Sequence, residues 1–280
     1  MRWRAGRVEK NCRCVRSLCS GSVLGLPSLD LGNTVPQRGR NGFVVHPRAR
    51  GNERQKQTLM SFISKSPWGT ELCRSDLDRV VAASVERTFA KGSAVLSASD
   101  LAQHWVGVIQ GLVAQSVTHV DGHVSFLSAV SDGAWFGEGT LVQRGHWGYD
   151  AVVLRDTHVA LVPLKTFEWL RETSLPFNHF LQVLMNDRLR IFTSLLLSSR
   201  HSTTEGRVAT ALSNFFQPAQ YTRERFVRIS QSELAMLAGT SRQRANDALK
   251  RLHELGLVET RRQGVEVLDL DGLRAAATAS

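Results

Sequence analysis

The segment 230–255 limits what this chain can fold into more than any other part of its sequence. Ser230 is followed three residues later by Glu233, the spacing of a capping box that begins a helix at the next residue, Gln231. Gly239 then supplies a tight turn before a second apolar period begins. Two short helices joined by a three-residue turn that contains glycine predict a helix-turn-helix.

The second of these helices is predicted to have two chemically different faces. Apolar residues recur at intervals of three and four and predict its buried face: Ala245, Ala248, Leu249, Leu252 and Leu255. The opposite face carries polar residues: Arg242, Gln243, Asn246, Asp247 and Lys250. Arginine reads guanine edges, glutamine and asparagine read adenine, and lysine contacts phosphate. This face indicates DNA recognition, with a helix face that only meets water as the simpler alternative.

A basic hairpin follows the two helices. Leu257–Thr260 and Val265–Leu268 are predicted strands, and the turn between them contains Arg261 and Arg262, which suit backbone phosphates. The succession of capping box, turn, second helix and basic hairpin favours a winged helix-turn-helix over a merely solvated face. Thr240 and Ser241 are alternative caps of the second helix. The candidate DNA-binding residues are Gln231, Thr240, Ser241, Arg242, Gln243, Asn246, Lys250, Arg261 and Arg262.

The middle of the chain, about 84–166, has the pattern of short strands broken by turns. Turn signals include Asp121-Gly122, with His119 and His123 expected to lie exposed beside it. Runs of apolar and aromatic residues separate the turns: Trp105–Val113, Val124–Val130, Ala151–Leu154 and His158–Leu164. Short strands at roughly ten-residue spacing predict an antiparallel jelly roll or sandwich.

A long helix is predicted from Phe177 to about Ser198. Its apolar residues occupy more than one stripe, so it must bury a second face. One face can pack on the strand domain of its own chain, and the other favours the same helix of a second subunit. A helix buried wholly within its own chain is the alternative. A further helix is predicted at Arg207–Phe216 and a strand at Arg225–Ile229.

The net charge of +10 suggests a nucleic-acid partner until it is mapped along the chain. Residues 1–59 hold twelve of the 35 Lys and Arg but three of the 25 Asp and Glu, so nearly all of the excess lies there. The basic composition therefore says nothing about the folded part. Residues 1–59 show no apolar period and are rich in Arg, Gly, Ser and Asn, which predicts irregular or disordered backbone.

We interpret residues 1–59 as a dispensable extension. Met60 is the first methionine after Met1, so a native protein that starts at Met60 would mean that the start codon has been assigned too early. An Arg-rich transit peptide fits the composition better than a secretory signal does. Cys12, Cys14 and Cys19 lack the paired spacing of a structural zinc site, so no metal site is expected. Cys73 then implies no disulfide, which is consistent with a reducing cytoplasm. No run approaches eighteen apolar residues, so no membrane association is expected.

The arrangement resembles the Crp/Fnr family of bacterial transcription regulators over roughly residues 75–275. The resemblance rests on these motifs: Phe89-Ala90-Lys91-Gly92, Asp121-Gly122, Gly133 with Phe136-Gly137-Glu138, Asn186-Asp187-Arg188-Leu189, and Ile229–Leu257. It implies an α+β fold, with a jelly-roll sensor domain at 60–176, a dimerisation helix at 177–200 and a winged helix-turn-helix at 201–280. It also implies a homodimer on near-palindromic double-stranded DNA, half-sites about 10 bp apart, contact with RNA polymerase, and control by an effector.

The chain departs from the family where an effector would bind. Gly137 and Glu138 are candidate pocket residues, but where cyclic AMP-binding members carry an Arg-Ser pair this sequence has Trp147-Gly148. Arg144 and Arg155 are near in sequence, yet both stand beside turn residues and are expected to be exposed. The four cysteines lack the spacing of the iron-sulfur members, and no histidine is identified as a haem ligand. We therefore expect no cyclic AMP, iron-sulfur cluster or haem, and an apolar or neutral ligand or none.

Two other classes of function compete with DNA-binding regulation. A cupin-type enzyme would need an H-x-H motif on a barrel strand, and the nine histidines contain none. We therefore expect no catalytic residue, no metal ligand and no enzymatic activity. The second alternative is a dimeric regulator or scaffold whose winged helix contacts protein instead of DNA.

Overall fold

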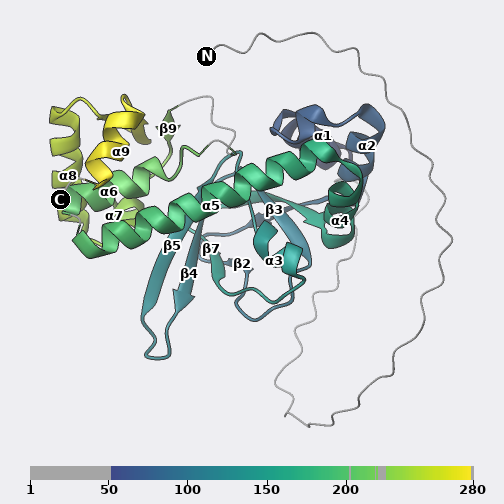
Figure 1. Ribbon diagram of the computed structural model, residues 1–280, viewed down its shortest axis with the longest axis horizontal. Helices are drawn as coiled ribbons and strands as arrows, with labels where there is room; N and C mark the ends of the chain where they lie inside the picture. Colours follow the sequence, from purple (N-terminus) through teal and green to yellow (C-terminus); the bar gives the residue numbers. More distant parts are fainter. Residues whose placement is uncertain (1–51, 202, 218, 220–224, 279–280) are drawn as a thin grey trace. The chain divides into compact units, whose positions relative to one another are not determined.

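The computed structural model describes residues 52–201, 203–217, 219 and 225–278. Strands occupy the region from Val85 to Pro163, and helices dominate before and after it (Figure 1). This order confirms the predicted α+β class. Cys12, Cys14 and Cys19, with most of the predicted extension, lie outside the described residues.

Two four-stranded antiparallel sheets form the jelly roll, one in the order β1-β8-β3-β6 and the other in the order β2-β7-β4-β5. The strands are β1 Val85–Phe89, β2 Ala94–Leu96, β3 His104–Gln110, β4 Leu112–Thr118, β5 Val124–Ser131, β6 Trp135–Phe136, β7 Asp150–Val153 and β8 Thr157–Pro163. Valine, leucine and alanine side chains between the two sheets form a buried core.

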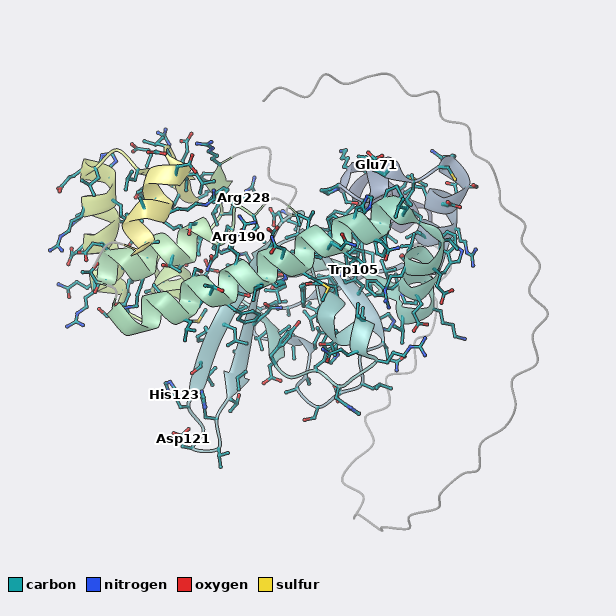
Figure 2. The ribbon with its side chains drawn as sticks, in the orientation of Figure 1. Glu71, Trp105, Asp121, His123, Arg190 and Arg228 are labelled. Carbon is teal, nitrogen blue, oxygen red and sulfur yellow. The ribbon has the colours of Figure 1, made fainter. Side chains whose placement is uncertain are left out.

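The predicted single strand Trp105–Val113 is wrong, because the chain changes sheet at Gly111. Gly111 has a φ of +131°, and a Cβ atom at this position would overlap the Oγ1 of Thr157. Only a glycine lets the backbone leave β3 and enter β4 at such a close approach. The hairpin β4–β5 then extends to the turn at Asp121, where His119 and His123 are exposed as predicted (Figure 2).

Helices cover the roll: α1 Asn52–Lys65, the 3₁₀ turn Gly69–Glu71, α2 Arg74–Ala83, α3 Glu138–Gln143 and α4 Leu164–Thr173. The predicted boundary after residue 59 is too late, because α1 crosses it and Leu59 is buried. Leu59 belongs to the same core cluster as Trp68, Trp105 and Trp135. The rings of Trp105 and Trp135 stack with centroids 4.3 Å apart.

The long helix α5 runs over Leu175–His201, two residues earlier than predicted (Figure 1). Pro176 lies in its first turn, where a missing backbone N–H costs nothing. One face of α5 is buried: Phe177, Phe180, Leu181, Leu184 and Ile191. The first four of these residues belong to the core cluster that contains Trp105 and Trp135 of the roll. Large apolar residues are exposed elsewhere on the helix: Val183, Met185, Leu189, Phe192 and Leu196. The predicted second apolar face is therefore present in the single chain.

The C-terminal part, which we call the winged-helix domain, begins at Thr204. Its elements are α6 Thr204–Ser213, β9 Phe226–Val227, α7 Gln231–Leu237, α8 Arg242–Glu254, β10 Val258–Arg261, β11 Gly264–Val267 and α9 Leu270–Thr278. The strands pair antiparallel in the order β10-β11-β9. Both hydrogen bonds of the predicted capping box between Ser230 and Glu233 are present, and Gly239 has a φ of +58°. Within the described residues, no helix is long and apolar enough to cross a membrane.

Candidate nucleic-acid interface

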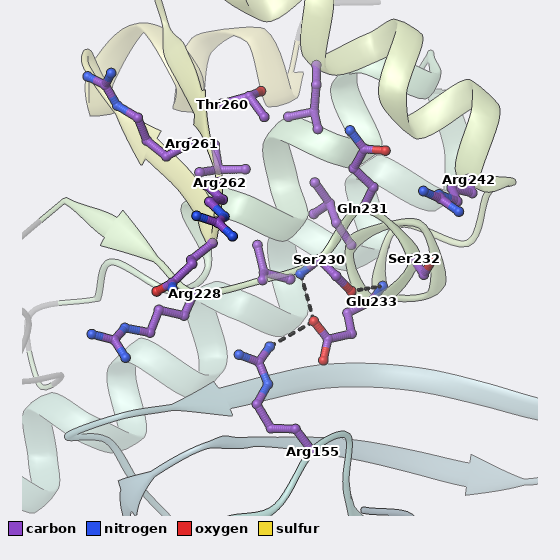
Figure 3. A pocket seen from close by; sticks show the side chains of 16 residues that line it. Arg155, Arg228, Ser230, Gln231, Ser232, Glu233, Arg242, Thr260, Arg261 and Arg262 are labelled. Atoms are coloured by element: carbon purple, nitrogen blue, oxygen red, sulfur yellow. Dashed lines mark hydrogen bonds and ion pairs between the residues drawn. The ribbon is translucent and has the colours of Figure 1, made fainter.

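The start of α7, the start of α8 and the hairpin β10–β11 converge on an open cleft of about 740 Å³ (Figure 3). The charged residues that line it are Arg155, Arg228, Glu233, Arg242, Arg261 and Arg262. Polar residues of α7 and the hairpin complete the lining: Ser230, Gln231, Ser232, Thr260 and Gln263. Five guanidinium groups against one carboxylate give the cleft a strongly positive lining, which suits a polyanion.

The α8 helix has the two faces that its apolar period predicts, except at its end. Ala245, Ala248, Leu249 and Leu252 are buried in the core of the winged-helix domain. The prediction that Leu255 is buried is wrong, because this residue follows the last turn of the helix and is 67% exposed. Arg242, Gln243 and Lys250 are exposed on the other face. The hydroxyl of Ser241 accepts a hydrogen bond from the backbone N–H of Arg244 at 3.3 Å and so caps the helix.

Two predicted site residues contact each other across the helix-turn-helix. The Gln231 side-chain amide donates a hydrogen bond to the Asn246 carbonyl oxygen at 2.9 Å. This contact orients Asn246, which is half-buried, from the neighbouring helix α7. Lys250 lies 3.7 Å from the carboxylate of Asp247 and stays exposed.

Of the predicted site residues, Gln231, Arg242, Arg261 and Arg262 line the cleft, whereas Ser241, Gln243, Asn246 and Lys250 lie on α8 or at its start outside the cleft lining. Thr240 lies elsewhere. Its hydroxyl oxygen is buried and has no hydrogen-bond partner within the described residues. Thr240 lines a different, mainly apolar groove that is shared with β5 and α5. Of the two alternative caps, the structure therefore uses Ser241.

The hairpin β10–β11 is the predicted wing, with both of its arginines exposed. The guanidinium of Arg261 donates twice to a carboxylate oxygen of Glu266, at 3.1 and 3.0 Å. Arg228 also lines the cleft and was not predicted, although it lies only two residues before the capping box. Sequence analysis also expected Arg155 to be a solvent-exposed residue at a strand end. That expectation is wrong, because Arg155 is ion-paired with Glu233 of α7 at 2.7 Å.

The candidate effector pocket is a second, smaller cavity of about 180 Å³. It is lined by Gln115, Gly137, Glu138, Gly139, Thr140, Tyr149, Met185, Arg188 and Phe192. Gly137 has a φ of +96°, and a Cβ atom there would lie 2.8 Å from Cη2 of Trp147. The Trp147 indole, which is buried, therefore packs directly on this glycine.

The two charged residues of the effector pocket, Arg188 and Glu138, form an ion pair. Arg188 donates to Glu138 at 3.0 Å, and the two side chains are 17% and 4% exposed. Arg188 also donates to the Trp135 carbonyl. The other carboxylate oxygen of Glu138 is buried and has no hydrogen-bond partner within the described residues. Burial, with the negative charge of Glu138, raises the pKa of the Tyr149 phenol, which therefore stays neutral.

Two protein-family models match the two halves of this structure. The model of the cyclic nucleotide-binding domain matches residues 86–174, which include the jelly roll. The model of the Crp-like helix-turn-helix domain matches residues 206–276, which include the capping box, α8 and the wing.

Curated relatives match across both halves. The chain is 28% identical over 202 residues to the cyclic AMP receptor protein of Thermus thermophilus, which covers 72% of this chain and 92% of the relative. It is 26% identical to the cAMP-activated global transcriptional regulator Vfr of Pseudomonas aeruginosa, over 66% of this chain and 90% of Vfr. The structure of FixK2 from Bradyrhizobium japonicum shares the fold, with 19% identity, a TM-score of 0.56 and coverage of 70% and 98% of the two chains.

Proposed function

Since this chain belongs to the Crp/Fnr family of transcription regulators, we propose that it binds near-palindromic double-stranded DNA as a homodimer and controls transcription in the bacterial cytoplasm. One observation carries this proposal. The start of the recognition helix α8 and the tip of the wing line one cleft whose charged groups are five arginines and one glutamate. Arg242 and Asn246 would read bases, while Arg261 and Arg262 would hold backbone phosphates.

The homodimer is supported by the exposed face of α5. Met185, Leu189 and Phe192 recur at intervals of four and three, and Leu189 is 65% exposed in the single chain. A second copy of α5 would bury this stripe, since apolar side chains at this spacing form the seam of paired helices. We expect L189D to be monomeric by light scattering while wild type is dimeric. A monomeric wild type at micromolar concentration would contradict the proposal.

We propose further that cyclic AMP is not the effector. The pocket is smaller than the roughly 300–1,000 Å³ of ordinary ligand sites, at about 180 Å³. Arg188 is the cation among its lining residues, and it is ion-paired with Glu138. A cyclic phosphate would enter beside a carboxylate and without a free cation, which is strongly unfavourable. A small neutral ligand, or no ligand, fits these groups better.

Calorimetric titration tests the proposal about cyclic AMP. The cyclic AMP receptor protein of Thermus thermophilus serves as the positive control, and we expect this chain to give no saturable heat under the same conditions. Saturable binding by wild type would overturn the proposal. We also propose that the chain holds neither haem nor an iron-sulfur cluster. This proposal rests on the sequence, in which the four cysteines lack the spacing of the iron-sulfur members of the family and no histidine is identified as a haem ligand.

Selection from a random duplex pool, followed by footprinting, tests the DNA-binding proposal. Wild-type protein should enrich a sequence with two inverted half-sites about 10 bp apart and protect it in a salt-dependent, saturable manner. We propose that the protein has no catalytic activity. We also propose RNA polymerase as a further partner, which would be detected as a cooperative footprint of the two proteins beside the enriched site. A protein that enriches no duplex would instead be a regulator or scaffold that contacts protein.

A further inference from the structure

The turn between β7 and β8 contacts the helix-turn-helix through a pair of charged residues. The Arg155 guanidinium lies 2.7 Å from a Glu233 carboxylate oxygen, and the two side chains are 32% and 16% exposed. The same oxygen accepts the Ser230 backbone N–H at 2.7 Å, the bond that closes the capping box (Figure 3). One carboxylate therefore joins the jelly roll to the start of α7.

The turn that carries Arg155 is held firmly on the roll. The buried Thr157 hydroxyl donates to the Arg155 carbonyl at 2.7 Å and lies 3.3 Å from the backbone N–H of Leu112. The next residue, Asp156, accepts a hydrogen bond from the backbone N–H of Lys91 at 2.9 Å. These hydrogen bonds fix the backbone at Arg155 and at the two residues after it. The Arg155 side chain therefore starts from a defined position on the roll when it pairs with Glu233.

Apolar packing extends the same contact. Leu112, at the start of β4, is fully buried in the core cluster that contains the apolar residues of α6, α7 and α8. Ala129 of β5 and Leu154 of the β7–β8 turn also pack against that cluster. The jelly roll and the winged-helix domain therefore share apolar contacts beside the pair. Because the Glu233 side chain is only 16% exposed, the pair is less screened by water than an ion pair between fully exposed side chains.

The contact leaves the DNA-reading surface uncovered. Arg242, Gln243 and Lys250 of α8 and both arginines of the wing are exposed while Arg155 holds Glu233. The contact therefore orients the winged-helix domain without blocking its access to a duplex. Orientation matters in a dimer, because two recognition helices must meet half-sites at a set separation.

We propose that Arg155 is a positioning residue for DNA binding: by pairing with Glu233 it fixes the angle of each winged-helix domain and so sets the half-site spacing that the dimer accepts. This inference rests on the proposed function. Without the pair, a winged-helix domain could reach half-sites at more separations, but its effective concentration at each half-site would be lower. Loss of the pair should consequently lower affinity at the best spacing and flatten the preference among spacings.

Four variants separate this role from others. R155A removes the cation, whereas E233Q removes the charge on the other side and keeps the cap, because glutamine also serves in a capping box. R155K keeps a positive charge on the turn. R144A is the matched control, because Arg144, the residue that ends α3, also forms an ion pair but with Glu168 of α4, at 2.7 Å, and not with the winged-helix domain.

The probe is the duplex that wild type enriches from a random pool, together with versions whose half-sites are moved by one, two and five base pairs. R155A and E233Q should each bind the original duplex about five- to tenfold more weakly and show a flatter spacing profile. R155K should keep most of the preference, and R144A should match wild type. Light scattering and thermal melting verify that each variant is a folded dimer.

Two results would overturn the inference. If Arg155 instead touched phosphate directly, R155A would weaken all spacings equally and lower the salt slope by about one, while E233Q would bind more tightly. Unchanged spacing profiles in both folded variants would equally reject it. If wild type enriches no duplex, the proposed function is rejected and the inference with it. If wild type enriches a duplex and the spacing profiles of the variants are unchanged, only the inference is rejected.

Discussion

The effector pocket and the DNA-binding cleft each contain an arginine–glutamate pair, but the pairs leave different chemistry behind. In the pocket, Arg188 and Glu138 lie 3.0 Å apart, with side chains 17% and 4% exposed, and no other arginine, lysine or histidine of the described residues lines the cavity. In the cleft, Arg155 pairs with Glu233 and Arg261 with Glu266, but Arg261 stays exposed, as do three further arginines: Arg228, Arg242 and Arg262. Affinity for an anion thus depends on which cations are already paired, and a count of basic residues does not reveal it.

The two regions should also respond differently to the loss of an arginine. Removing one partner of a buried ion pair leaves an uncompensated charge in a medium of low polarity, so the folded state loses stability. Removing an exposed arginine leaves the fold intact and takes away a contact to the ligand. Arginine variants in the pocket should therefore lower the free energy of unfolding, and arginine variants in the cleft should lower the affinity for DNA.

The largest expected effect is that of R188A in the pocket. It leaves the buried Glu138 carboxylate without its cation, and we expect a loss of about 3–5 kcal/mol in the free energy of unfolding. Urea denaturation at a fixed protein concentration measures it. The matched control is R251A, which breaks the largely exposed pair with Glu205 and should cost less than about 1 kcal/mol. Equal losses in the two variants would remove the distinction between buried and exposed pairs.

R242A in the cleft should change binding by about 1–3 kcal/mol and relax the preference at one base pair of each half-site, because a bidentate arginine–guanine contact is lost. Arg242 is exposed at the first position of α8, so the unfolding free energy of the R242A variant should match that of wild type. Titration of duplexes with single base changes measures the preference. Identical base preferences in wild type and R242A would exclude Arg242 from base recognition.

R261A should have a smaller and less specific effect. Arg261 lies on the wing, and its guanidinium is shared with Glu266 at 3.0 Å, so a phosphate would compete with that carboxylate. We expect similar weakening on every sequence and a fall of about one in the slope of log affinity against log salt. A loss confined to one base pair would instead place Arg261 among the base-reading residues.

Local sequence patterns were sufficient to predict the winged-helix domain. A capping box, a glycine turn and an apolar period each act within a few residues, so Ser230, Gly239 and Ala245 reveal their structural roles from sequence alone. The exposed apolar face of α5 could also be predicted, because its apolar residues recur at a helical spacing within a single helix. Short helices such as α3, at six residues, carry too little periodicity for prediction.

The contacts that define both sites were beyond sequence analysis because they join distant residues. Arg155 and Glu233 are 78 positions apart, and Arg188 and Glu138 are 50 apart. No spacing rule links such pairs, and only the folded sheets and helices bring them together. The packing of Trp147 on Gly137 likewise depends on where α3 leaves β6. Nothing in the sequence indicated that Arg188 of α5 lines the pocket, because this residue is far along the chain from Gly137 and Glu138.

The smallest expected effect concerns pH and separates the jelly roll from the cleft once more. Burial, and then the nearby Arg87 charge, lower the pKa of His104 at the start of β3 below its usual value of 6.5. The unfolded chain therefore binds more protons than the folded chain once the pH falls below about 6.5, so the folded state loses stability there until the lowered pKa is reached. Arginines do not titrate in this range, so the salt slope of DNA binding should stay constant over the same interval.

H104Q tests this assignment, because glutamine keeps a polar side chain of similar size and cannot be protonated. The unfolding free energy of wild type should decline as the pH is lowered from 7.5 through 6.5, and the decline should be shallower in H104Q. H123Q, at the exposed tip of the β4–β5 hairpin, controls for the removal of a histidine from the roll and should retain the wild-type decline. Urea denaturation across the pH series measures all three proteins. If H104Q declined as steeply as wild type, the acid sensitivity would belong to other groups, and burial at the start of β3 would have no measurable effect on folding.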